Sequence, residues 1–120
     1  MAVIDPHHSL LWQKQLLKLK LFLGKTPDLN AILFLIGVQE LGKGNLPYSK
    51  EQKQDLMSLA TCRLLEPLGF FKLDGHDEDG WPVYVQQESL PVMPLQQQEF
   101  FLQQQIIEYF KNVEGLSVLK

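Results

Sequence analysis

The segment from Leu29 to Leu41, LNAILFLIGVQEL, is apolar on nearly every side of a helix. A helix that is hydrophobic all round has to be buried. Asn30, Gln39 and Glu40 interrupt the segment, and it is shorter than the roughly 20 apolar residues that a membrane span needs. The sequence therefore predicts a core helix around which the other helices and a hairpin pack.

The flanks of this helix carry start and stop signals. Thr26 is expected to cap it, Pro27 to take the first helical position, and Asp28 to place a negative charge in the first turn. Gly42 is expected to end it in a left-handed conformation. Inside the helix, Gly37 predicts a place where another helix approaches the backbone closely.

Caps and hydrophobic periods define the remaining elements. Ser9 is expected to cap the first helix, and Ser49 with Gln52 has the spacing of a capping box. The period then changes to short aromatic and β-branched runs on either side of a glycine-rich acidic loop, which predicts a β-hairpin. The predicted fold is α+β and mostly helical, in a single domain, with helices at about 10–23, 27–41 and 50–66, hairpin strands at about 70–74 and 81–85, a C-terminal helix at about 95–113, and loose tails at 1–8 and 115–120.

Within the hairpin, Pro82 cannot donate a ladder hydrogen bond, so it is expected at an edge or as the first residue of its strand. A lone hairpin needs a helical layer beneath it. We expect Phe71 and Leu73, together with Val83 and Val85, to form the face that packs on the helices.

Composition limits the classes of function. The 120 residues carry a net charge of −3 with a pI near 5.5, which makes nucleic acid an unlikely partner because that binding depends on Lys and Arg. Cys62 is the single cysteine, as is typical of a reducing compartment. The first residues lack the pattern of a secretory signal. A cytoplasmic location is therefore expected, with no membrane partner, no cofactor and no metal.

The C-terminal segment carries two apolar stripes, more than one packing face needs. Either the terminal helix packs in a groove, or one stripe meets a partner subunit. On the second interpretation the protein forms a homodimer through its first or last helix. The candidate interface residues are Trp12, Phe100, Phe101, Ile107 and Phe110.

The loop DGHDEDG and its flanking aromatic residues form a second candidate surface. Trp and Tyr are common hot spots of recognition, so Trp81, Tyr84, Asp77 and Asp79 are a candidate recognition surface. The alternative is that the aromatic residues are simply the hydrophobic face of a small sheet. The loop lacks the calcium-binding EF-hand pattern, and a solvated acidic turn is the preferred interpretation.

Catalytic residues are not indicated by any motif. Cys62 has no histidine near it in the sequence, and a nucleophile needs a base, so a small buried side chain is the better interpretation. Arg63 and Glu66 have the spacing of an ion pair on the helix surface. A small-ligand protein or enzyme that uses Glu40, Cys62 or the acidic loop remains an alternative.

Two resemblances accompany these patterns. A helix that ends in LLEPLGFF and runs into a hairpin closed by WPVYV resembles, over residues 27–85, the element order of winged-helix domains. That resemblance implies a DNA-binding regulator, for which Lys14, Lys18 and Lys25 are the candidate basic face, although the acidic loop would repel phosphate. The stretch from GVQELGKG to DEDGWP is similar to a group of small uncharacterised bacterial proteins, which implies no activity.

These observations favour a non-enzymatic cytoplasmic protein that acts by protein association, as a homodimer. The winged-helix-like DNA-binding regulator and the small-ligand protein or enzyme are the alternatives.

Overall fold

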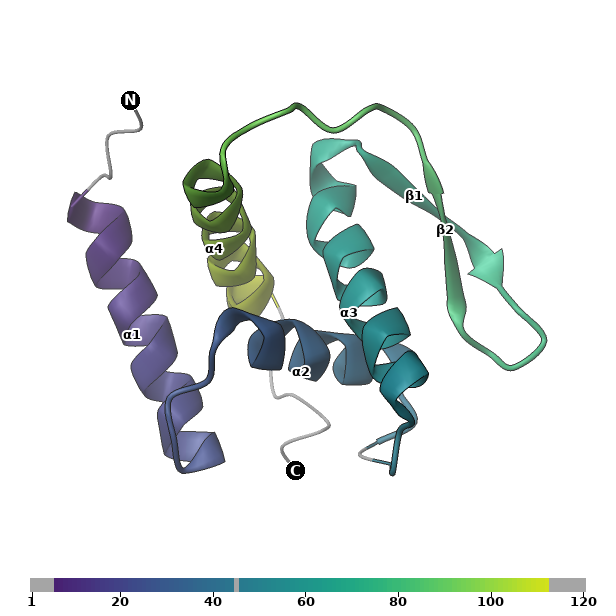
Figure 1. Ribbon diagram of the computed structural model, residues 1–120, viewed down its shortest axis with the longest axis horizontal. Helices are drawn as coiled ribbons and strands as arrows, with labels where there is room; N and C mark the ends of the chain where they lie inside the picture. Colours follow the sequence, from purple (N-terminus) through teal and green to yellow (C-terminus); the bar gives the residue numbers. More distant parts are fainter. Residues whose placement is uncertain (1–5, 45, 113–120) are drawn as a thin grey trace. The chain divides into compact units, whose positions relative to one another are not determined.

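The computed structural model describes residues 6–44 and 46–112 (Figure 1). Three helices, a hairpin and a C-terminal helix follow one another in the chain, which confirms the predicted α+β class. Residues 1–5 of the expected tail at 1–8, the expected tail at 115–120 and the expected helix end at 113 lie outside the described residues. The elements are α1 (Pro6–Leu23), α2 (Leu29–Leu41), α3 (Lys50–Leu65), the short 3-10 helix η1 (Glu66–Leu68), β1 (Phe71–His76), β2 (Pro82–Gln86) and α4 (Leu95–Asn112).

The chain divides into two compact units. Residues 28–90 hold α2, α3, η1 and the hairpin, and we call this part the hairpin unit. Residues 1–27 and 91–114 hold α1 and α4, and we call this part the helical pair. The single domain, and the packing of α1 and α4 around α2, stay predictions.

Helix α2 begins at Leu29, two residues later than the sequence indicated. Asp28 is its N-cap, since the Asp28 side chain accepts a hydrogen bond of 2.8 Å from the Ala31 backbone N–H. The expected roles of Thr26 as cap and Pro27 as first helical residue are therefore wrong, because the carboxylate of Asp28 satisfies the free amide instead. Gly42 ends the helix with φ of 75° and donates its N–H to the Val38 carbonyl, as predicted.

Gly37 marks the crossing of α2 and α3. A Cβ atom at this position would overlap the Leu56 carbonyl oxygen, and it would lie 2.7 Å from the Leu56 carbonyl carbon and 2.9 Å from the Leu56 Cβ. The predicted close approach of another helix is confirmed. Beside this crossing lies a core cluster of Val38, Leu41, Tyr48, Leu56 and Leu59, against which Phe34, Trp81 and Tyr84 pack.

Helix α3 begins with the predicted capping box. The Ser49 hydroxyl accepts from the Gln52 N–H at 3.1 Å, and the Gln52 side chain accepts from the Ser49 N–H at 2.9 Å. Two amide groups that the helix leaves free are thereby satisfied.

Replacement of Ser49 by Ala is expected to lower the free energy of unfolding by about 1 kcal/mol, because the Gln52 amide loses its acceptor. Urea denaturation followed by circular dichroism measures this change. Ser58→Ala, an exposed serine inside the same helix, is the matched control. It should leave stability unchanged or raise it slightly, since Ala favours helix interiors.

The hairpin register corrects the expected packing face. Leu73 pairs with Tyr84 and Lys72 pairs with Val85, and residues directly opposite each other share a face of the sheet. Val83 and Val85 therefore face away from Phe71 and Leu73, and both valines are exposed. Leu73 is also exposed, so its expected burial against the helices is wrong too. Because side chains alternate along a strand, Tyr84 is the β2 residue that packs on the core cluster. Pro82 is the first residue of β2, as expected.

Helix α1 of the helical pair begins at Pro6, so Ser9 does not cap it and His7 and His8 belong to the helix rather than to a tail. Proline suits a first helical position. Gly24, with φ of 82°, donates its N–H to the Lys20 carbonyl and ends α1, close to the predicted helix end at about residue 23.

His8 joins α1 to α4. The His8 ring nitrogen Nε2 lies 3.1 Å from the Gln103 side-chain oxygen, and the imidazole stacks at 4.3 Å on the Phe100 ring. His8 is buried. This side of α1 is therefore the one that packs on α4.

Candidate functional site

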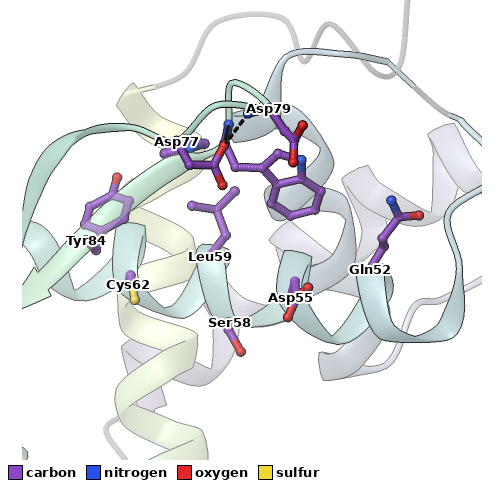
Figure 2. A pocket seen from close by; sticks show the side chains of 10 residues that line it. Gln52, Asp55, Ser58, Leu59, Cys62, Asp77, Asp79 and Tyr84 are labelled. Carbon is purple, nitrogen blue, oxygen red and sulfur yellow. Dashed lines mark hydrogen bonds between the residues drawn. The ribbon is translucent and has the colours of Figure 1, made fainter.

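An open groove of about 430 Å³ lies between α3 and the hairpin. Figure 2 shows its side chains, which come from one face of α3 and from the loop and second strand of the hairpin. All of its residues belong to the hairpin unit. The groove is lined by Gln52, Asp55, Ser58, Leu59, Cys62, Asp77, Asp79, Trp81, Pro82 and Tyr84.

Helix α3 supplies one wall. Asp55, Ser58 and Cys62 follow one another at intervals of three and four residues, which places them on one side of a helix. Figure 2 shows Asp55, Ser58 and Cys62 in a row along α3, with Leu59 between the helix and the hairpin. Leu59 is buried and belongs to the core cluster, so the floor of the groove is continuous with the core.

The hairpin loop supplies the other wall and is organised by Asp77. One carboxylate oxygen of Asp77 accepts hydrogen bonds of 2.9 Å from both the Asp79 and the Trp81 backbone N–H groups. The Lys43 ammonium donates to the Asp79 carbonyl oxygen and ties the loop to the segment after α2. The loop is therefore held in one shape, with the Asp79 side chain directed over the groove (Figure 2).

Tyr84 closes the end of the groove near Cys62 (Figure 2). Burial, followed by the nearby carboxylates of Glu66 and Glu40, raises the pKa of Tyr84 to about 12. The tyrosine therefore keeps its proton and offers a neutral hydroxyl at neutral pH.

Arg63 and Glu40 join α3 to α2 behind this site. The Arg63 Nε lies 3.2 Å from a Glu40 carboxylate oxygen. Glu66, the partner that helical spacing suggested for Arg63, accepts a hydrogen bond of 3.3 Å from the Leu73 N–H and so fixes β1 to η1. Glu40 is not one of the groove residues.

Cys62 lines the groove, but its surroundings do not activate it. Burial raises the pKa of the Cys62 thiol, so the reactive thiolate is disfavoured. The ten groove residues include no histidine that could act as its base. The arrangement gives no support to nucleophilic chemistry at this position.

All four residues of the candidate recognition surface, Trp81, Tyr84, Asp77 and Asp79, line the groove. The sequence did not predict that residues of α3 form part of this site. The three- and four-residue spacing from Asp55 to Cys62 was the available signal, but it shows only which α3 residues share a face and not which face the hairpin covers.

The candidate interface residues lie in the helical pair. Ile107 is buried, and Trp12, Phe100, Phe101 and Phe110 are half-buried. Phe100 contacts His8, and the Phe110 ring packs edge-on against Tyr109 at 5.4 Å. Several of these side chains thus have partners within the helical pair. The large apolar residues that the structure exposes on this unit lie elsewhere, mainly on α1.

Over residues 6–44 and 46–112, no three His, Cys, Asp or Glu side chains are arranged to hold a metal ion. In the same part of the chain, none of the helices has the length and apolar character needed to cross a membrane. Comparison with family models, with curated proteins and with solved structures gives no match to this chain.

Proposed function

We propose that the protein is non-enzymatic and acts by protein association in the cytoplasm, with the groove between α3 and the hairpin as the surface that binds the partner. The observation that supports this proposal is the convergence of Trp81, Tyr84 and three carboxylates on one open groove. The first partner to test is a second copy of the chain, because the protein is expected to form a homodimer.

The chemistry of the groove selects a cationic, partly apolar segment. Asp55, Asp77 and Asp79 present negative charge, and aromatic faces attract Lys and Arg side chains. The Leu59 floor offers an apolar contact. A duplex phosphate backbone would instead be repelled by the three carboxylates, which weighs against the DNA-binding alternative for this surface.

The rigidity of the loop also supports recognition. The Asp77 carboxylate and the Lys43 ammonium hold the loop before any partner binds. A preformed surface loses little conformational entropy on association.

The test reverses two groove charges, as Asp55→Lys with Asp79→Lys. This variant should weaken both self-association and the binding of a peptide of alternating lysine and leucine by about tenfold or more, because attraction becomes repulsion at each site. Light scattering measures the self-association, and fluorescence anisotropy measures the peptide. Asp77 is left intact because its carboxylate organises the loop.

The matched control is Glu78→Lys with Asp74→Lys. Both residues are exposed, lie on the hairpin and are absent from the groove lining, so this variant has the same net charge as the groove variant. Equal weakening in the two variants would mean that net charge, not the groove, controls association. The proposal would be refuted if the unmodified protein were strictly monomeric and did not bind the peptide.

A further inference from the structure

Helix α1 has two apolar sides, and α4 covers only one of them. His8 and Leu19 are buried on the covered side. Leu10 is nine residues from Leu19, which places it about half a turn away around the helix. Leu17 and Leu21 follow Leu10 at intervals of seven and four residues, so the three leucines form one row along the opposite side.

This outer row is exposed. The exposed fractions are 66% for Leu10, 57% for Leu17 and 78% for Leu21. Single exposed leucines are ordinary, but three of them along one side of a helix mark a surface that meets something apolar.

Lysines flank the outer row on both sides. At 100° per residue, Lys14 lies at the edge of the row between Leu10 and Leu17, Lys18 lies farther to the same side, and Lys20 lies on the other side. All three lysines are exposed. Residues 6–27 contain four lysines and no acidic residue. Because the whole chain has a net charge of −3, the remaining residues together carry −7, so residues 6–27 differ from the rest of the chain in having a net positive charge.

We propose that the outer face of α1 docks on an anionic lipid surface. Such a surface matches both parts of the face: its phosphate headgroups attract the lysines, and the acyl boundary beneath them accepts the leucines. Lysine side chains reach the headgroups while their stems lie along apolar surface. A helix of this kind lies in the plane of the interface and does not cross the bilayer.

Two other occupants fit the face less well. A second α1 packed antiparallel across a two-fold axis would bring the flanking lysines of both copies together, and like charges oppose such a contact. Nucleic acid would neutralise the lysines but would leave the leucine row without an apolar partner. The lipid surface satisfies both the charge and the apolar row.

Co-sedimentation of the full chain with vesicles tests the proposal. The protein should bind vesicles in which about a third of the lipid is phosphatidylglycerol, bind pure phosphatidylcholine vesicles far less, and be released as salt is raised. Absence of binding to the anionic vesicles, or equal binding to both compositions, would overturn the proposal.

Two variants separate the apolar and the charged contribution. Leu17→Gln with Leu21→Gln should weaken vesicle binding about 100-fold, and Lys14→Gln with Lys18→Gln about 30-fold. The matched controls are Leu90→Gln with Leu95→Gln, and Lys50→Gln with Lys53→Gln, which change exposed residues outside α1. The controls should bind as the unmodified protein does, and equal losses in the controls would contradict the assignment to α1.

Measurement of the oligomeric state distinguishes a lipid surface from a second copy of the chain as the partner of this face. The unmodified protein could be a dimer that does not bind vesicles, and the leucine variant a monomer. In that case the face is a contact between copies, and the lipid proposal is wrong. Circular dichroism of each variant confirms that the helices remain folded. Since the lipid proposal uses none of the groove residues, failure of the groove test leaves it unaffected.

Discussion

Replacement of Gly37 by Ala is expected to lower the free energy of unfolding by about 3 kcal/mol, because the added methyl group collides with the backbone of α3. The atoms that it meets include the carbonyl oxygen and carbon of Leu56. A backbone carbonyl cannot rotate away as a flexible side chain can, so α2 and α3 have to separate. Urea denaturation followed by far-ultraviolet circular dichroism measures the loss.

A loss of stability in the Gly37→Ala variant could not be explained by the helix propensity of the new residue. Ala has a higher helix propensity than Gly by about 1 kcal/mol, so without the crossing the substitution would stabilise α2. Asn30→Ala, at an exposed position of the same helix, is the matched control and should change stability by less than about 0.5 kcal/mol. A Gly37→Ala protein as stable as the original would show that the two helices do not cross at this residue.

Leu56→Ala is expected to cost a similar amount, about 3 kcal/mol, for a different reason. Leu56 is fully buried in the core cluster, and truncation of a buried leucine loses apolar burial and leaves a cavity. The midpoint of urea unfolding should fall, while the variant keeps the same helical spectrum before the transition.

Leu73, an exposed leucine of the same unit, provides the matched control for Leu56→Ala. Leu73 lies on β1 and is 40% exposed, so Leu73→Ala should cost less than about 1 kcal/mol. Comparable losses in the two variants would contradict the burial that the structure assigns to Leu56.

Local signals in the sequence predicted the elements well. The capping box at Ser49, the glycine stop at Gly42 and the proline at the start of β2 all lie where expected. Each depends on hydrogen bonds or dihedral restrictions within a few residues. The starts of α1 and α2 were misplaced, because several residues in a row could have begun each helix and the choice depends on which side chain reaches the free amides.

Contacts between distant segments were harder to predict. The sequence proposed the acidic loop and its aromatic neighbours as a surface, but it did not show that α3 forms the opposite wall. It also placed Val83 and Val85 on the packed face of the hairpin, whereas the pairing of Leu73 with Tyr84 puts them on the other face. A shift of one residue in register exchanges the two faces of a strand, and the composition of the strands does not fix it.

The basic, leucine-rich composition of α1 was visible in the sequence, but its significance was not. A helix with apolar residues on several sides can bury all of them or only some, and periodicity alone does not tell which. In the structure His8 and Leu19 are buried, while Leu10, Leu17 and Leu21 remain exposed.

The sequence by itself determined that Leu29 to Leu41 forms a buried helix and that Gly37 lies where another helix crosses it, because both follow from local composition and from the missing side chain. Only the tertiary structure identified Leu56 as the residue at that crossing, placed Asp55 and Cys62 opposite the hairpin loop, and left one row of α1 uncovered. These facts depend on which faces meet across long stretches of chain, and that choice is made by the packing of the whole unit rather than by any single segment.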